Sequence, residues 1–219
     1  MTLRFTLRAD GPTDAMLLPI LRWVLECALP EVEIESQFAC PELLPRGTSR
    51  KLVPSILATI NYYPCDILFI HRDAEREEYD FREAEIRTAL NQLADLGTIA
   101  NIPVVPVRMS EAWLLIDEAA IRRASGNPNG KTKLSLPSLR DIEKLPNPKA
   151  TLHALLKSAC ELNGRRLKSF RADDCTPLVS EWIEDFSLLK KLPAFHRFQR
   201  SVDEFCDGYR GRQMTHPAP

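Results

Sequence analysis

Residues 66–75 read Asp-Ile-Leu-Phe-Ile-His-Arg-Asp-Ala-Glu and set the architecture of the whole chain. The first half, Asp66–Ile70, is an apolar run typical of a parallel strand that is buried on both faces. The second half is acidic, so Asp73 and Glu75 come just after the end of that strand. In an open α/β sheet, ligands bind outside the carboxyl ends of the strands. The stretch therefore predicts a parallel sheet and a place for a functional site.

Strand and helix patterns alternate on both sides of this stretch, over residues 1–107. Further strands are expected at Leu3–Leu7, Val32–Glu35 and Ile102–Val107. Helices are expected at Ala15–Leu29, from Thr48 or Ser49 to Asn61 with a kink at Pro54, and at Phe81–Leu96 before Gly97. The alternation predicts the α/β class, with a Rossmann-like core and a mostly parallel sheet.

Two of these strands carry additional information. In the first, Leu3, Phe5 and Leu7 alternate with Arg4, Thr6 and Arg8, which indicates one solvated face. In the last, prolines 103 and 106 interrupt the apolar run. Because proline cannot donate to a strand ladder, this strand should be short or lie near the edge of the sheet.

The pattern changes after Glu111. Helices are expected at Glu111–Ile116, Glu118–Ala124, Lys149–Leu162, Leu178–Leu189 and Phe195–Phe205, with a polar loop over residues 125–149. The predicted layout is an α/β core over residues 1–124, a basic loop and helical region packed on it over residues 125–207, and a flexible tail over residues 208–219.

Composition is that of a globular protein, and the charge is unevenly distributed. The formal net charge is −1, but residues 1–121 carry a net −8, residues 122–172 a net +9 and residues 173–219 a net −2. An acidic region followed by a basic one suits a metal site beside a polyanion track; solvated helix faces are the alternative interpretation. The six cysteines show no metal or redox spacing, and no apolar run could span a membrane. We expect a cytoplasmic protein with free thiols and no membrane partner.

Acidic residues follow three of the predicted strands. They are Asp10 and Asp14 after the first, Asp73 and Glu75 after the third, and Glu111 after the fourth. Gathered carboxylates repel one another unless a cation lies between them, and Mg²⁺ prefers oxygen ligands. The alternatives are ordinary: Asp14 could cap a helix, Glu111 could complement a helix dipole, and the Asp73–Glu75 segment could be a solvated loop.

Together these clusters resemble the Toprim superfamily, a Rossmann-like domain of primases, topoisomerases and some nucleases. The residues that match its pattern are Asp10-Gly11 and Asp73-Ala74-Glu75, and Gly11–Asp14 looks like the Gly-x-Thr-Asp of its overcoming-lysogenization-defect nucleases. Residues 106–117 contain Glu111-Ala112-Trp113-Leu114 and Asp117, similar to a Glu-Ala-Trp-Leu-x-x-Asp signature of an uncharacterised bacterial Toprim family. Leu192–Phe198 resembles the ending of that family.

The resemblance implies a Mg²⁺- or Mn²⁺-dependent phosphodiesterase that acts on DNA or RNA, with Asp10, Asp73 and Glu111 as catalytic residues. Its implied metal ligands are Asp10, Asp14, Asp73, Glu75 and Glu111. Arg72, Lys131, Lys133 and Lys149 are the expected nucleic-acid contacts. It also implies an ABC-type ATPase partner in phage defence, and it leaves homo-oligomer formation open.

Two departures from the family pattern support a second hypothesis. Asp10 stands where the family has a longer glutamate, and Glu75 where it has a shorter aspartate. Because productive site geometry is tight, the chain could instead be a degenerate subunit that binds the ATPase or nucleic acid without cutting. An alignment in which Asp14 replaces Asp10 also stays open.

Overall fold

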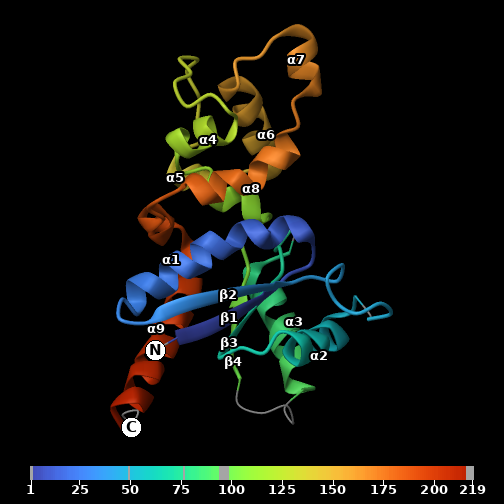
Figure 1. Ribbon diagram of the computed structural model, residues 1–219, viewed down its shortest axis with the longest axis vertical. Coiled ribbons are helices and arrows are strands. Elements are labelled where there is room, and N and C mark those ends of the chain that lie inside the picture. Colours follow the sequence, from blue (N-terminus) through green and yellow to red (C-terminus); the bar gives the residue numbers. More distant parts are fainter. Residues whose placement is uncertain (1, 49, 76, 94–98, 216–219) are drawn as a thin grey trace.

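The computed structural model describes residues 2–48, 50–75, 77–93 and 99–215 of the chain. Its centre is a parallel sheet of four strands in the order β2-β1-β3-β4 (Figure 1). The strands are β1 (Thr2–Arg8), β2 (Glu33–Ala39), β3 (Ile67–His71) and β4 (Ala100–Val104). This confirms the predicted α/β fold with a Rossmann-like core. The chain places β2 and β3 on opposite sides of β1, so the carboxyl ends of β1 and β3 form the switch point at which such sheets bind ligands.

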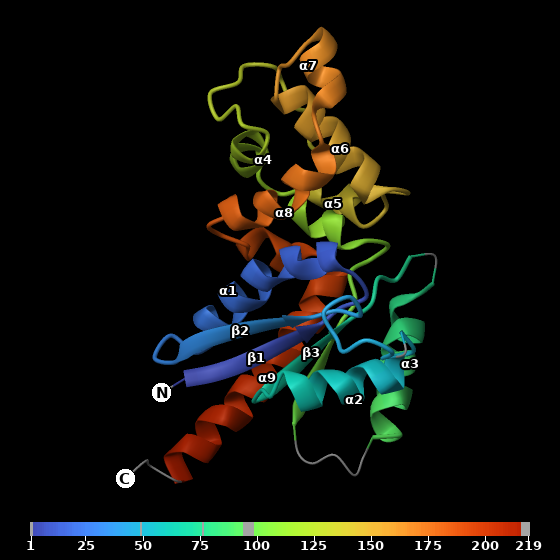
Figure 2. The same ribbon diagram turned by 45° about the vertical axis from the view of Figure 1, so that its right-hand side comes forward.

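Helices cover both faces of the sheet (Figure 2). The 3-10 helix η1 (Pro12–Leu17) leads into α1 (Leu18–Ala28), which lies with the long C-terminal helix α9 (Pro193–Thr215) on one face. The opposite face is covered by α2 (Leu52–Tyr62) and α3 (Tyr79–Asn91). The predicted helix end at Leu96 and Gly97 lies outside the described residues.

The predicted solvated face of β1 is confirmed at Arg4, whose side chain is 44% exposed, but the prediction was wrong at Thr6 and Arg8. Thr6 and Arg8 are completely or almost completely buried, because α2 lies over them. The Thr6 hydroxyl donates to the carbonyl of Tyr63, and Nε of Arg8 donates to Oγ of Ser55 in α2. Polar side chains on this strand are thus held inside the protein by hydrogen bonds, which buried polar groups require.

Prolines in the core behave as their position in each element dictates. Pro103 lies in β4, the edge strand, as the sequence predicted. The Val104 carbonyl faces β3 and accepts from the Arg72 amide. Position 103 therefore faces the other way, and the missing N–H of Pro103 costs no hydrogen bond between the strands.

Pro54 is the third residue of α2, where helix amides have no intrahelical partner, so it fits the first turn. α2 begins at Leu52, so Thr48 does not cap it, and Ser49 lies outside the described residues.

A helical region follows the sheet and packs against its carboxyl edge. Its elements are η3 (Ser110–Leu114), α4 (Glu118–Ala124), α5 (Leu139–Ile142), α6 (Pro148–Ala159), α7 (Gly164–Ser169), α8 (Ala172–Trp182) and η4 (Ser187–Lys191). α8 contacts η1 and α6 contacts η3. One hydrophobic cluster runs without a break from the α1 face of the sheet into this region.

The largest differences from the predicted helix boundaries are in α8 and α9. α8 begins at Ala172, six residues before the predicted start at Leu178, and it contains Pro177. The Thr176 hydroxyl donates to the Ala172 carbonyl within this turn. α9 continues through Gly208 to Thr215, so residues 208–215 are helical and not a flexible tail. Cys206 and Val202 of α9 are buried in the main core, which explains why the helix persists.

The six cysteines are all free, and three of them are buried. Within the described part of the chain, no helix is both long enough and apolar enough to cross a membrane.

Candidate functional site

Asp14 lies directly beyond the carboxyl end of β1, in η1. Gly11 precedes this helix in an extended conformation, and its amide donates to Oδ2 of Asp14 at 2.9 Å. The capping role that the sequence allowed for Asp14 is therefore present. This hydrogen bond uses only one carboxylate oxygen of Asp14. The other, Oδ1, lies 3.7 Å from Nε2 of His71. The turn thus presents one oxygen of a buried carboxylate to the edge of the sheet.

His71 is the last residue of β3 and is almost completely buried. Its Nδ1 lies 3.0 Å from the carbonyl oxygen of Val104, which can only accept, so Nδ1 carries the hydrogen. This bond fixes the ring, and Nε2 then faces Oδ1 of Asp73 at 3.5 Å as well as Asp14. A ring nitrogen therefore lies between two carboxylates that come from different strand ends.

Asp73 is held against this ring by Ser110. The Ser110 hydroxyl lies 3.2 Å from Nε2 of His71 and donates to Oδ1 of Asp73 at 3.1 Å. The pKa of Asp73 is raised to about 6, mainly by burial and also by the nearby charges of Asp14 and Glu111, while His71 and Ser110 act in the opposite direction. Asp73 is thus a carboxyl group whose ionised form is poorly stabilised by the protein itself.

Glu111 completes this group from η3, where its side chain is buried. Burial raises the pKa of Glu111, and the charge of Asp14 adds to the increase. Its own backbone amide, Lys149 and His71 act in the opposite direction. Asp14, Asp73 and Glu111, which follow three different strands, therefore influence one another electrostatically. We call them, with His71 and Ser110, the acidic cluster.

Asp10 lies outside the acidic cluster. Its Oδ1 is 2.7 Å from Nη1 of Arg8, and its Oδ2 is 3.2 Å from Nε of Arg72. Arg72 also pairs with Glu85 of α3. The carboxylate of Asp10 is 45% exposed and already has two cationic partners. Of the two alignments that the sequence left open, the geometry favours Asp14 as the β1 acid that approaches Asp73.

Glu75 also points elsewhere. We expected Asp73 and Glu75 to share one side of an extended segment, but the backbone turns into the left-handed region at Glu75, with φ of +55°. Its amide donates to the carbonyl of Arg108, which has φ of +63°. The Glu75 side chain is 68% exposed and pairs with Arg82 at 3.4 Å. The turn thus separates the two acids.

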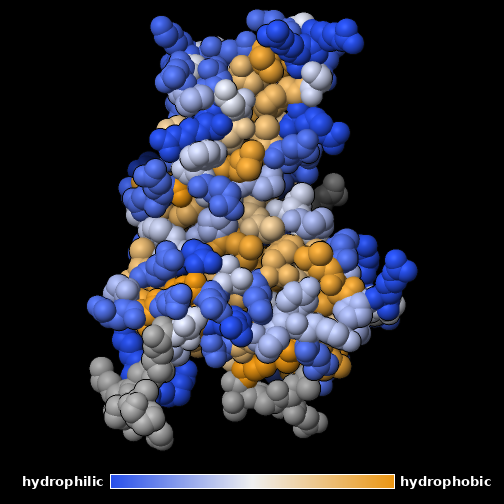
Figure 3. Space-filling model, viewed as in Figure 1, coloured by the Kyte–Doolittle hydropathy of each residue, from blue (hydrophilic) through white to orange (hydrophobic). Residues whose placement is uncertain are grey.

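The expected nucleic-acid contacts are dispersed. Lys149 begins α6 close enough to Glu111 to lower its pKa, and it pairs with Asp173 at 3.1 Å. Lys131 and Lys133 are exposed on the loop between α4 and α5. This loop, yellow-green in Figures 1 and 2, lies at the outer end of the helical region, away from the sheet. Figure 3 shows hydrophilic side chains at that end. Lys149 is therefore the lysine of this set that lies beside the acidic cluster.

Sequence reasoning gave other roles to two members of the cluster. Position in the sequence alone favours a helix cap for Ser110 and a packed strand-end role for His71. His71 is indeed packed, and its ring also faces the acids. The available signal was proximity to the acids in the sequence, because His71 lies two residues before Asp73 and Ser110 directly precedes Glu111. Asp117 does cap α4, by accepting from the Ala120 amide.

The donor atoms of the acidic cluster suit a hard cation, although they are not arranged as a finished cage. Carboxylate and hydroxyl oxygens are the ligands that Mg²⁺ prefers. Among the described residues, no three His, Cys, Asp or Glu side chains are placed to hold a metal ion as they stand. A bound cation would therefore require these carboxylates to rearrange. Asp14, Asp73 and Glu111 fit such an ion by charge and burial.

Comparison with models of known protein families, with curated proteins and with solved structures gave no match.

Proposed function

We propose that this protein is a metal-dependent phosphodiesterase of the Toprim type that acts on DNA or RNA. The observation that carries the proposal is the acidic cluster itself. Three carboxylates from three strand ends gather at the carboxyl edge of a parallel sheet, and two of them have raised pKa values. Burying such charges is costly unless they are paired, so a cation is the partner that this arrangement calls for.

Asp14, Asp73 and Glu111 would hold Mg²⁺ or Mn²⁺. When bound, such an ion lowers the pKa of water and neutralises negative charge on a phosphoryl group. The remaining residues position these ligands. Ser110 orients Asp73 by donating to Oδ1, and His71 is fixed by Val104 between Asp14 and Asp73. Asp10 and Glu75, expected as ligands from the sequence, take no part in this arrangement because arginines bind them.

Plasmid nicking and RNA cleavage in Mg²⁺ or Mn²⁺ test this proposal. Asp73→Ala should reduce cleavage by at least about a hundredfold, which is typical when a group essential to the chemistry is removed. Glu75→Ala is the matched control, because this acid lies two residues away but faces Arg82. Cleavage that survives Asp73→Ala unchanged would exclude the assignment.

A degenerate subunit is the second candidate, and two observations favour it. The carboxylate of Asp10 is engaged by Arg8 and Arg72, and no ready cation cage exists among the described residues. Such a subunit would bind nucleic acid, or an ABC-type ATPase in a phage-defence system, without cutting. A gel-shift assay that shows bound nucleic acid, with no product in either metal, would favour it over the nuclease.

A further inference from the structure

A pocket lies beyond the end of β1, where it is lined by residues outside the acidic cluster. It has a volume of about 420 Å³ and is lined by Arg8, Asp10, Pro41, Arg50, Lys51, Leu52, Arg72 and Glu85. Four of these side chains are cationic and two are anionic. The pocket lies beyond the carboxyl ends of β1 and β3, at the switch point of the sheet. We call it the basic pocket.

Arg8 is the reason to regard this pocket as built for an anion. Its side chain is only 1% exposed, which is rare for arginine. Nε is fixed by Ser55, so the guanidinium is held rigidly and Nη1 reaches the pocket residue Asp10. A buried guanidinium needs an anionic partner, and the one it has is half-exposed.

Asp10 itself occupies the position that an anion would take. Its two oxygens bridge Arg8 and Arg72, which is how a phosphate or a free carboxylate binds between arginines. The interaction of Asp10 with Arg72 is less complete than its interaction with Arg8. Nε of Arg72 is buried and, despite its ion pair with Asp10, has no hydrogen-bond acceptor among the described residues. The arginines are thus incompletely satisfied by the protein.

We propose that the basic pocket binds a phosphate group, with Arg8 and Arg72 as its principal donors and with Asp10 as an internal anion that the phosphate displaces. Arg50 and Lys51 add positive charge at the rim. This inference deepens the proposed function, on which it rests for the idea that the phosphate belongs to a nucleotide or nucleic acid. It also explains why Asp10 lies outside the acidic cluster.

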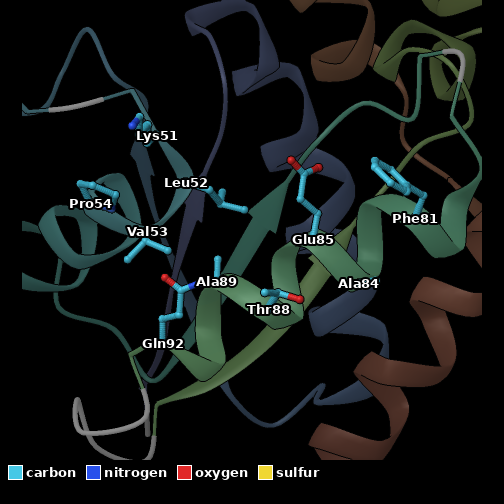
Figure 4. Close-up of a pocket in the computed structure, with 10 residues that line it drawn as sticks. All are labelled: Lys51, Leu52, Val53, Pro54, Phe81, Ala84, Glu85, Thr88, Ala89 and Gln92. Carbon is cyan, nitrogen blue, oxygen red and sulfur yellow. The ribbon is translucent and has the colours of Figure 1, made fainter.

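An apolar groove continues from the basic pocket and shares Lys51, Leu52 and Glu85 with it. The groove runs between α2 and α3 and has a volume of about 700 Å³ (Figure 4). Its other lining residues include Val53 and Phe81. The organic part of a phosphate ester could extend into this groove, so an ester should bind more tightly than inorganic phosphate does.

Calorimetry in EDTA tests the proposal without involving a metal. The probes are inorganic phosphate, a nucleoside 5′-monophosphate, and one oligonucleotide with and without a 5′-phosphate. Arg72→Gln should weaken binding about tenfold, since a charge-assisted hydrogen bond contributes about that factor. Arg50→Gln should weaken it less, because this side chain is 74% exposed and easily tolerates substitution. Asp10→Asn should tighten binding several-fold by removing the competing anion.

Arg87→Gln is the matched control, since Arg87 is an exposed arginine paired with Glu83 on α3, away from the pocket. Preference for the 5′-phosphorylated strand would assign the pocket to a strand end, and binding of the mononucleotide alone would assign it to a free nucleotide. Equal weakening by Arg72→Gln and Arg87→Gln, or no binding of any probe at millimolar concentration, would overturn the proposal. Because EDTA removes divalent cations, a failed cleavage assay would not affect this result.

Discussion

His71 contacts most members of the acidic cluster at the edge of the sheet. Its ring is fixed by a carbonyl, and its free nitrogen lies within 4 Å of Asp14, Asp73 and Ser110. The ring therefore lies between the two carboxylates without supplying a proton to either from Nε2. The ionised form of Asp73 is left poorly stabilised, which has a consequence for the stability of the protein.

Asp73→Asn should stabilise the metal-free protein above pH 6. Burial raises the pKa of Asp73 from 3.8 to about 6, so the folded state binds more protons than the unfolded state between these values. The free energy of unfolding of the wild type therefore falls as pH rises from about 4 through 6. The asparagine variant lacks this loss and should be more stable at pH 8 by on the order of 2 kcal/mol.

Urea unfolding in EDTA at several pH values measures this difference. It should be small at pH 4 and grow as pH rises. A difference that stays constant with pH, or that shrinks towards pH 8, would mean that the ionised Asp73 is already well compensated.

At this scale, sequence position predicted which residues follow the strands but not where their side chains point. Asp73 follows the end of β3 by two residues, and Glu111 lies in η3, the element that follows β4, so both come to the same edge of the sheet. Asp10 was assigned to the same cluster, and its direction is set by Arg8, a residue whose burial depends on α2 packing across β1. The expected direction of the Glu75 side chain was wrong, because its backbone is left-handed. This conformation is uncommon for residues other than glycine, and the surrounding sequence does not indicate it.

At the scale of elements, α9 fastens the helical region to the sheet. Its Phe198 ring contacts Phe69 of β3 and Trp113 of η3, with ring centroids 5.9 and 6.0 Å apart. Phe198→Ala should therefore lower the free energy of unfolding by about 3–5 kcal/mol, as for other buried aromatic residues. Phe81→Ala is the control, since that ring is 55% exposed on α3. Equal effects of the two substitutions in urea unfolding would contradict the packing of α9.

The reactivity of the Cys206 thiol tests whether α9 stays packed against the core. Burial raises the pKa of its thiol to about 11, so only about one molecule in a thousand carries the reactive thiolate at pH 8. Mass spectrometry after iodoacetamide treatment of the native protein should find Cys27, which is exposed, modified well before Cys206. Comparable rates would show that α9 does not stay packed.

The elements themselves were largely predictable, and the errors have local causes. Apolar runs and alternation located all four strands, because those patterns follow directly from burial of strand faces. A helix was expected from Leu178, but α8 begins at Ala172 and includes Pro177. A flexible tail was expected from Gly208, whereas buried residues on the preceding turns of α9 keep that segment helical. Tertiary packing overrides local propensity in both places.

At the scale of the whole molecule, the acidic cluster and the basic pocket both lie beyond the end of β1. The acidic cluster lies on the side where η1 and η3 meet the helical region, and the basic pocket lies on the side of α2 and α3. The two proposals together would place a phosphate held by arginines near a cation held by carboxylates, an arrangement that stabilises charge in phosphoryl transfer. Both sites use the switch point between β1 and β3.

Calorimetric titration with Mg²⁺ and with Mn²⁺ tests the central claim most directly, namely that Asp14, Asp73 and Glu111 form a cation site. The wild type should bind, Asp73→Ala and Asp14→Asn should abolish binding, and Asp10→Asn should leave it intact because that carboxylate pairs with arginines. A wild type that binds neither ion, or binding that Asp73→Ala and Asp14→Asn leave unchanged, would contradict the claim.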